Sequence, residues 1–234
     1  MKKICICGGS LGHVIAGYLS ANGKATVSIL TNHPTAWQNK IEICVPDNGE
    51  MLIGNIACVS ANPAEALLDA EIVLLCLPGF LIKDELIKIR DFINSGTYVG
   101  SVFSSTGFFF EALKLLNEDI PLWGFQRVPF ISRIKEYGHS ASLLGYKGCY
   151  HIAVERDTDA NKELFRYWVE NSFDRPVTLL KNYLEASLTN SNPLLHTARL
   201  YSMFHDWQPG ISYPRNILFY EEWTEEASEL YIQA

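Results

Sequence analysis

The stretch MKKICICGGSLGHVIAG, residues 1–17, runs from an apolar segment through a glycine-rich turn into a helical pattern. Lys2 to Cys7 is predicted to form a short strand, and Gly8 and Gly9 let backbone approach phosphate groups without a Cβ in the way. Gly12 allows close packing of strand and helix, whose N-terminus attracts anions. This order predicts a turn that holds the pyrophosphate of a dinucleotide, made of Gly8, Gly9, Ser10, Leu11 and Gly12.

The glycine spacing departs from the G-x-G-x-x-G pattern of dinucleotide sites at one position. Aligning Gly9 and Gly12 with the second and third glycines places Cys7 at the first. A tight turn in an unrelated α/β domain is the alternative. The strand before the turn and the helix after it favour the dinucleotide site.

Length and composition are typical of a folded protein with a sizeable core. The chain has 234 residues, of which 48% are hydrophobic and 19% charged. This length suits one large domain, or a domain followed by a smaller lobe. The net charge of −7 disfavours nucleic acid as a partner, because a phosphate-backbone binder needs a basic face.

Neither a membrane segment nor a metal site is predicted. No apolar run approaches the roughly 20 residues that span a bilayer, and the first strand is too short for a signal peptide. We therefore expect a cytoplasmic protein. The six cysteines include no C-x-x-C pair, and Cys5 and Cys7 are expected on opposite faces of their strand, so reduced, buried thiols are predicted.

Strand patterns alternate with helical patterns over residues 1–181, which predicts an α/β domain with a Rossmann-type parallel sheet and helices on both faces. Further strands are expected at Ala25–Thr31, Ile56–Ser60, Glu71–Leu77, Tyr98–Phe103, Pro121–Phe125, Cys149–Val154 and Pro176–Leu180. Helices are expected at Pro63–Asp69, Leu81–Phe92 and Ala160–Asn171.

Residues 182–234 carry helical patterns only, at Tyr183–Phe204 and Ser212–Gln233. We expect them to begin a helical domain for substrate binding and dimerisation. The segment is small for an independent domain, and it ends within an unfinished helical pattern. A truncated chain is therefore expected.

The end of the second predicted strand normally selects the cofactor. An acidic residue there binds the ribose hydroxyls of NAD, and its absence near basic residues admits the 2′-phosphate of NADP. Here Thr31 and Asn32 can donate hydrogen bonds, and His33 or Lys40 can add positive charge. NADP is the favoured cofactor and NAD the alternative, although these can also be ordinary loop residues.

Two further loops follow predicted strands at the carboxyl edge of the sheet, where α/β folds bind ligands. Pro78 ends one strand, and Ser104 begins the Ser-rich turn after another. We expect both to border the nicotinamide. The Ser-rich turn can instead be a cap for the following helix.

A row of polar side chains marks the segment after residue 188. In a helix, Asn192, His196 and Arg199 share one face, with Thr189 one turn earlier. Pro193 predicts a kink beside His196. Imidazole suits proton transfer near neutral pH, so His196 is the candidate catalytic residue, with Asn192 and Arg199 as substrate ligands. A packed or surface histidine is the alternative.

Arg127 and Arg133 interrupt the otherwise apolar segment 125–133. A guanidinium can bind a substrate carboxylate through two parallel hydrogen bonds, so Arg127 is a candidate substrate ligand. A structural ion pair is the alternative for either arginine.

Five segments together resemble the octopine/nopaline (opine) dehydrogenase family, in order and over nearly the whole chain. They are CGGSLGH ending at His13, LPGF ending at Phe80, GSVFSSTGFF ending at Phe109, QRVPF ending at Phe130 and NSNPLLH ending at His196. The resemblance implies a Rossmann domain followed by a helical domain, with substrate in the cleft between them. It also implies that NAD(P)H reduces the imine formed from an amino acid and a 2-oxo acid such as pyruvate.

The resemblance implies an acid/base role for His196, paired in that family with a later aspartate that has no counterpart here. Family members often form dimers, so a homodimer is expected. One alternative is a ketopantoate-reductase-like 2-oxo acid reductase. The lack of a convincing catalytic lysine argues against it. Another is a catalytically inactive, dinucleotide-binding regulatory protein.

Overall fold

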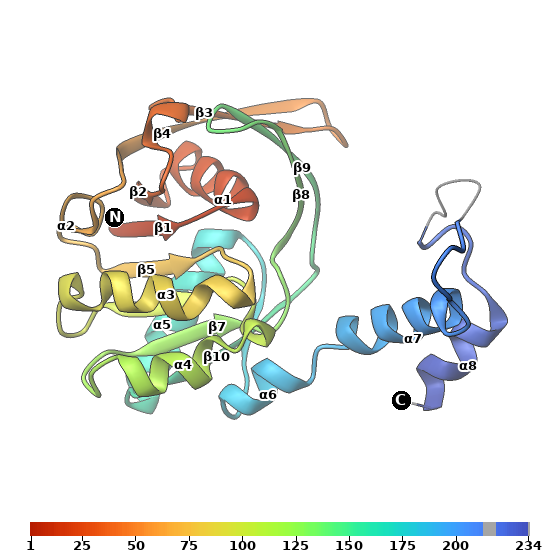
Figure 1. The fold of residues 1–234 in the computed structure, drawn as a ribbon. Coiled ribbons are helices and arrows are strands. Elements are labelled where there is room, and N and C mark those ends of the chain that lie inside the picture. The colour runs from red at the N-terminus through yellow and green to blue at the C-terminus, as the bar shows by residue number, and fades with distance from the viewer. Residues whose placement is uncertain (213–218, 234) are drawn as a thin grey trace. The chain divides into compact units, whose positions relative to one another are not determined.

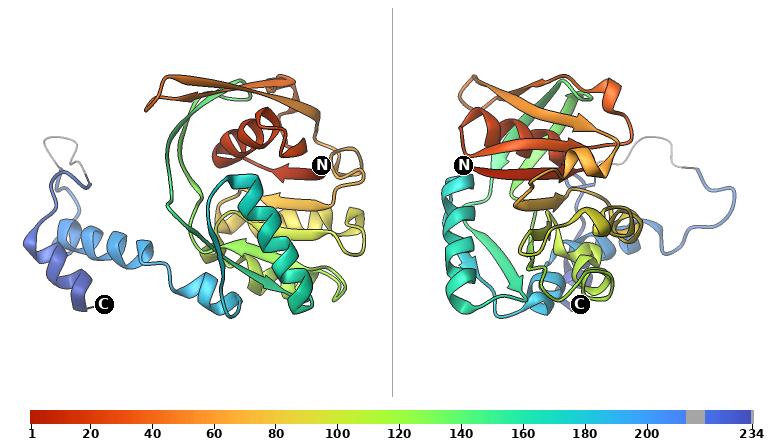
Figure 2. Two further views of the ribbon diagram at one scale, coloured as in Figure 1. Left: turned by 180° about the vertical axis from the view of Figure 1, so that it is seen from behind. Right: turned by 90° about the vertical axis from the view of Figure 1, so that its left-hand side faces the viewer.

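The computed structural model describes residues 1–212 and 219–233 and divides into two compact units, Met1–Thr189 and Asn190–Ala234. The first unit contains an eleven-stranded mixed sheet with helices against both faces (Figures 1 and 2). In the second unit, the described residues form helices and turns. Across the described ranges, every helix is too short or too polar to cross a membrane.

Parallel strands form the centre of the sheet. In spatial order they are β4 (Glu50–Ser60), β2 (Ala25–Leu30), β1 (Lys2–Cys7), β5 (Ile72–Leu75), β6 (Tyr98–Ser101) and β7 (Leu122–Phe125). Strand β1 thus lies between β2 and β5, the position where strand order reverses in a doubly wound sheet. The predicted Rossmann-like fold is confirmed.

Antiparallel pairing extends the sheet at both edges. On one side β10 (Tyr150–Glu155) runs antiparallel to β7, and β11 (Val177–Leu179) pairs in parallel with β10. On the other, β3 (Lys40–Val45) forms a hairpin with β4, and β8 (Phe130–Glu136) forms a hairpin with β9 (Ser140–Tyr146). Strand β9 joins the sheet by parallel pairing with β3. The sequence patterns did not predict β3, β8 or β9.

The two faces of the sheet bury separate hydrophobic cores. Helices α1 (Ser10–Ala21) and α5 (Asp159–Phe173) contribute to one core, and the other receives α2 (Pro63–Ala66), α3 (Gly79–Ile89), α4 (Phe108–Leu115) and α6 (Tyr183–Leu188). Alternate residues of β1 serve both cores, because successive side chains of a strand point to opposite faces. Ile4 and Ile6 lie in the first core, and Cys5 and Cys7 lie in the second.

The expectation that Cys5 and Cys7 lie on opposite faces is wrong, because residues two apart in a strand share a face. Both thiols are buried in the second core, where a hydrogen bond with Cys5 and burial raise the pKa of Cys7. All six cysteines are free. These two thiols therefore serve as small hydrophobic core side chains.

The single helix expected over 183–204 is divided. Helix α6 ends at Leu188, and α7 (Asn192–Phe204) begins after a short break. Pro193 lies in the first turn of α7, where backbone N–H groups have no intrahelical partner, so its missing N–H costs the helix no hydrogen bond. The break replaces the kink predicted beside His196. Of the helix expected over 212–233, residues 213–218 lie outside the described residues, 219–222 form turns, and α8 covers Glu225–Gln233.

Candidate functional site

Two glycines of the turn between β1 and α1 lie very close to neighbouring side chains. Gly8 has φ +88°, and a Cβ there would lie 2.2 Å from Cδ2 of Leu77. A Cβ on Gly12 would lie 3.1 Å from Cγ2 of Ile6, so the helix packs tightly against the strand. Gly12 thus allows the close packing of strand and helix that the sequence predicts, whereas glycine at position 8 is required by its positive φ and by the approach of Leu77.

The N-terminus of α1 is open to a ligand. Gly9 precedes the helix and has no side chain that could cap it, and the first turn contains no acidic residue. The first backbone N–H groups of a helix lack intrahelical partners and lie at the positive end of the helix dipole. This end of α1 is suited to an anionic group.

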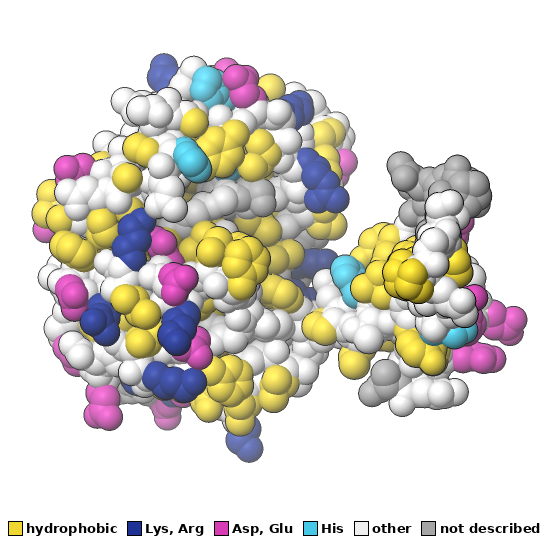
Figure 3. All heavy atoms as spheres, viewed as in Figure 1, with side chains coloured by type: hydrophobic (Ala, Val, Ile, Leu, Met, Phe, Trp, Pro, Cys, Tyr) yellow, Lys and Arg dark blue, Asp and Glu magenta, His cyan; other side chains and the backbone are white. Residues whose placement is uncertain are grey.

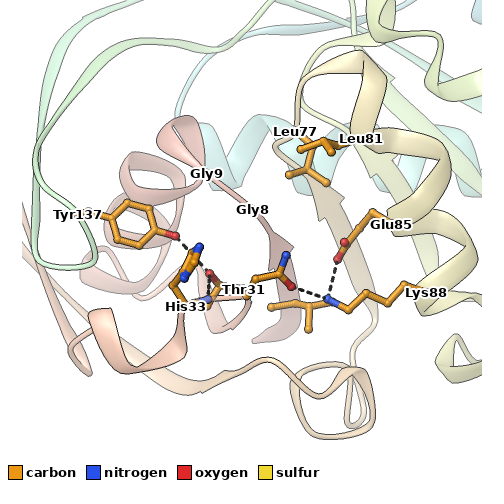
Figure 4. A pocket seen from close by; sticks show the side chains of 11 residues that line it. Gly8, Gly9, Thr31, His33, Leu77, Leu81, Glu85, Lys88 and Tyr137 are labelled. Carbon is orange, nitrogen blue, oxygen red and sulfur yellow. Dashed lines mark hydrogen bonds and ion pairs between the residues drawn. The ribbon is translucent and has the colours of Figure 1, made fainter.

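A cavity of about 230 Å³, cavity A, lies beside the glycine turn (Figure 4). Its lining residues come from the glycine turn after β1, the end of β2 and the loop after it, the loop after β5, helix α3 and the turn between β8 and β9: Gly8, Gly9, Leu30, Thr31, Asn32, His33, Leu77, Leu81, Glu85, Lys88 and Tyr137. Residues distant in the sequence thus form one cavity at the carboxyl ends of the strands.

Polar contacts cross cavity A. Nζ of Lys88 donates to Oδ1 of Asn32 at 3.3 Å and lies 3.8 Å from Oε1 of Glu85. The hydroxyls of Tyr137 and Thr31 are 3.2 Å apart, as Figure 4 shows. Burial raises the pKa of Glu85, and Lys88 opposes that shift. Cavity A therefore offers both an ammonium group and a carboxyl group.

A second cavity of about 640 Å³, cavity B, also lies at the carboxyl ends of the strands. Its lining is mostly apolar: Leu11, Cys76, Leu77, Pro78, Gly79, Val102, Phe103, Ser105, Thr106 and Val128. Leu77 lines both cavities, which are therefore neighbours. Ligand cavities in α/β proteins are commonly apolar with a few polar groups.

Of the two residues expected to border the nicotinamide, Pro78 lines cavity B and Ser104 does not. Ser104 is completely buried, and its hydroxyl donates to the carbonyl of Phe125 at 2.8 Å. Ser105 and Thr106 of the same Ser-rich turn line cavity B instead. Ser104 tethers this turn to β7.

In the second unit, His196 projects from α7 and is exposed. Its Nε2 lies 2.8 Å from the hydroxyl of Tyr220, and its ring is 5.0 Å from that of Phe219. Arg199 is buried, and its Nε donates to the carbonyl of Phe219 at 3.2 Å. Asn192 is exposed in the first turn of α7. Thr189, expected on the same helix face, belongs to the first unit and receives a hydrogen bond from Gln126.

The two arginines of segment 125–133 lie in different settings. Arg127 is exposed and lines a cavity of about 300 Å³ together with Gln126, Lys147, Gly148, Cys149, Tyr150 and His151. Arg133 is exposed on β8 and donates to the neighbouring carbonyl of Ser132. Arg127 is thus the one at a cavity.

Sequence reasoning missed Glu85, Lys88 and Tyr137 in cavity A, and Tyr220 beside His196. Leu81, Glu85 and Lys88 stand at i, i+4 and i+7 of one helix, a spacing that could have identified a shared face. Lys40, which the sequence suggested as a source of positive charge, lies on β3 and is not among the residues that line cavity A.

Charges of both signs are distributed over the surface that Figure 3 shows. On that face of the first unit, Lys and Arg side chains lie among Asp and Glu side chains. Within residues 1–212 and 219–233, no group of three or more His, Cys, Asp or Glu side chains could hold a metal ion. The glycine turn with its two cavities is therefore the candidate site of the first unit.

The fold and the candidate site define a Rossmann-like protein with two neighbouring cavities at the carboxyl edge of its sheet. No protein-family model matches the chain. An uncharacterized protein named y4xO, from Sinorhizobium fredii, is 28% identical over 223 residues, which are 88% of this chain and 58% of that protein. Tauropine dehydrogenase of Arabella iricolor is 25% identical over 248 residues, 98% of this chain and 62% of that protein.

Solved structures of dehydrogenases and reductases share the fold of this chain. Octopine dehydrogenase in complex with NADH and agmatine has a TM-score of 0.81 at 19% identity, covering 98% of this chain and 60% of that chain. Yersinopine dehydrogenase with bound NADP+ has a TM-score of 0.64 at 14% identity, covering 85% and 52%. A ketopantoate reductase from Ralstonia eutropha has a TM-score of 0.61 at 16% identity, covering 84% and 61%.

The resemblance to the opine dehydrogenase family is confirmed by these relatives. The chain is related to tauropine and octopine dehydrogenases over nearly all of its residues. It spans about three fifths of the length of the curated relatives that it matches.

Proposed function

We propose that this chain is the cofactor-binding part of an NAD(P)H-dependent dehydrogenase of opine type. The reaction would reduce the imine formed between the amino group of an amino acid and a 2-oxo acid. Its relatives named tauropine and octopine dehydrogenase support this assignment. The single observation that carries it is the glycine turn, which leads into a helix N-terminus without a side-chain cap and borders two neighbouring cavities.

The residues at the turn fit a nicotinamide dinucleotide. The backbone of Gly8 and Gly9 and the N–H groups at the start of α1 would hold the pyrophosphate. Cavity A would take the adenosine end, and cavity B, with Leu11 and Pro78, would take the nicotinamide end. When bound, the nicotinamide supplies the hydride, and these residues position it and exclude water.

NADP is the cofactor that we propose, with NAD as the alternative. The end of β2 offers Thr31 and Asn32 and no acid, and Lys88 brings positive charge to the same cavity, which His33 also lines. A 2′-phosphate requires such groups. Glu85 is the observation that favours NAD, because a carboxylate there can accept hydrogen bonds from ribose hydroxyls.

The second unit supplies the proposed catalytic residue. His196 is exposed, so its imidazole can exchange a proton with a substrate nitrogen, and Tyr220 can orient the ring through their 2.8 Å contact. Asn192 and two arginines, Arg127 and Arg199, are the proposed substrate ligands. Arg127 is the more accessible of these arginines, because Arg199 is buried against the carbonyl of Phe219.

The decisive experiment measures oxidation of NADPH and NADH with pyruvate and a panel of amino acids. We expect turnover that needs both substrates and is lost in H196A. H205A is the matched control, because His205 is an exposed histidine at the C-terminal end of the same helix. Cofactor binding without turnover would indicate a dinucleotide-binding regulatory protein, and turnover unaffected by H196A would refute the role of His196.

A ketopantoate-reductase-like activity is the second candidate, and the structural similarity to a ketopantoate reductase favours it. Such an enzyme reduces a 2-oxo acid directly. Reduction of 2-oxo acids in the absence of any amino acid would support this candidate over the opine-type reaction.

We also propose a homodimer in the cytoplasm. The second unit exposes Tyr201, Trp207 and Ile232, apolar side chains that self-association would cover. Sedimentation of the protein at several concentrations tests the dimer. A monomer at every concentration would refute it for this chain.

A further inference from the structure

His13 makes two short hydrogen bonds to backbone groups of two segments that are far apart from each other in the sequence. The N–H of Gly138 donates to Nε2 at 2.7 Å, and Nδ1 lies 2.8 Å from the carbonyl oxygen of Gly9. An amide N–H can only donate, so Nε2 is the unprotonated nitrogen and Nδ1 carries the proton that Gly9 accepts. The contacts therefore fix one neutral tautomer.

The imidazole is held on all sides. His13 has no exposed surface, and its ring stacks on Trp37 with ring centroids 4.2 Å apart. The ring of Tyr137 packs against it in a T-shaped arrangement, with ring centroids 5.0 Å apart. Burial lowers the pKa of His13, which favours the neutral ring that the two hydrogen bonds require. Rotation or protonation of the ring would break a contact.

The turn that Gly138 belongs to is seated on the segment after β2. Gly138 has φ +75°, and a Cβ there would lie 2.1 Å from the carbonyl oxygen of Ala36. The carbonyl of Gly138 also accepts from the N–H of Gln38 at 3.0 Å. This turn carries Tyr137, whose hydroxyl contacts Thr31 and lines cavity A.

His13 thus connects both ends of one wall of cavity A. Gly9, which accepts its proton, belongs to the glycine turn, and Gly138, which donates to it, lies next to Tyr137. We propose that His13 is a positioning residue for the nicotinamide dinucleotide: it sets the glycine turn and holds Tyr137 beside the adenosine end. This inference rests on the proposed function, because it assigns cavity A to that cofactor.

The test separates the two hydrogen bonds. In H13N the side-chain amide can replace Nδ1 and donate to Gly9. In H13Q the side-chain oxygen can replace Nε2 and accept from Gly138, and H13F keeps the stacking on Trp37 and loses both bonds. Each variant is compared with the natural chain by NADPH titration, thermal unfolding and hydrogen exchange of the Gly138 amide.

We expect H13F to weaken NADPH binding about tenfold or more, since each lost bond contributes on the order of a tenfold change. Exchange at Gly138 should be faster in H13N and H13F and close to the natural rate in H13Q. Y137F serves as the control that removes the contact with Thr31 and leaves both bonds of His13 in place.

Two results overturn the inference, and they differ from failure of the proposed function. Unchanged NADPH affinity in a folded H13F chain would show that His13 does not position the cofactor. Unchanged Gly138 exchange in H13N and H13F would show that the hydrogen bond to Nε2 of His13 does not hold this turn. If the natural chain binds neither NADPH nor NADH, the proposed function fails and the cofactor role of His13 fails with it, while exchange at Gly138 still reports the hydrogen bond to His13.

Discussion

Nε2 of His196 lies 2.8 Å from the hydroxyl of Tyr220, 24 residues further along the chain. Arg199, one turn beyond His196, is hydrogen-bonded to the carbonyl of Phe219 and so holds the neighbouring backbone. The aromatic pair Phe219 and Tyr220 is thereby fixed beside the imidazole. Orientation of the proposed acid/base residue is therefore built into the second unit itself.

The first prediction concerns this contact. Y220F removes the hydroxyl and keeps the ring, so the imidazole loses one orienting partner. We expect kcat of the proposed dehydrogenase to fall about three- to tenfold with little change in KM for NADPH, the effect of one hydrogen bond. Steady-state kinetics check this, with Y201F as the control, because Tyr201 is exposed on the same unit and stacks on His205. Equal loss in both variants would contradict the orienting role.

The second prediction concerns the choice of cofactor. Lys88 lies in cavity A beside Asn32, where a 2′-phosphate would gain a charge-assisted hydrogen bond. K88A should raise KM for NADPH by about ten- to a hundredfold and leave that for NADH nearly unchanged. The matched control is K83A, on the same helix and outside the lining of the cavity. A parallel rise for both cofactors would show that Lys88 does not read the phosphate.

The third prediction concerns packing at the glycine turn. In G12V the added side chain meets Ile6, which already lies 3.1 Å from an ideal Cβ. We expect the free energy of unfolding to fall by about 1–3 kcal/mol, as overpacking usually causes. Denaturant unfolding measures it. G148A is the control, because a Cβ on Gly148 meets no atom within 4 Å.

The fourth prediction concerns pH. Because burial lowers the pKa of His13 from its ordinary value of 6.5, the folded chain binds fewer protons there than the unfolded chain below pH 6.5. His13 therefore contributes stability that is present above pH 6.5 and is lost as the pH falls through the folded-state pKa. Tm should decline less steeply between pH 7 and pH 5.5 in H13Q than in the natural chain. Identical slopes would contradict the prediction.

The first strand and its turn were predictable because their determinants are local. The apolar run of β1 matches the expected bounds, and the close packing of Gly12 against Ile6 confirms the reason given for that glycine. The parallel centre of the sheet follows from the same alternation of strand and helix patterns. These features depend on neighbours in the sequence.

The missed strands depend on distant partners. On β8, Ile131, Arg133 and Lys135 are exposed and mix charged with apolar side chains, so the usual alternation is obscured. Strand β9 enters the sheet by pairing with β3, about a hundred residues earlier, with Glu42 opposite Ser140. No local pattern encodes such a pairing.

The candidate site shows the same division. Thr31 and Asn32 were identified from their place after a strand, whereas Lys88 and Tyr137 reach cavity A from a helix face and a hairpin turn. In the second unit, His196 and Arg199 were named from helical spacing, but their partners Phe219 and Tyr220 lie in turns. Sequence spacing therefore predicts His196 and Arg199 but not the residues that they contact.

The contribution of Tyr137 to cavity A sets an order of events during synthesis. A nascent chain that has emerged only through β2 already has the glycine turn, yet it lacks the wall that the hairpin β8–β9 brings. The missing wall depends on non-local pairing with β3, which forms slowly relative to local structure. If the proposed cofactor binds in cavity A, we expect it to stabilise the chain against unfolding only after residue 146 has left the ribosome.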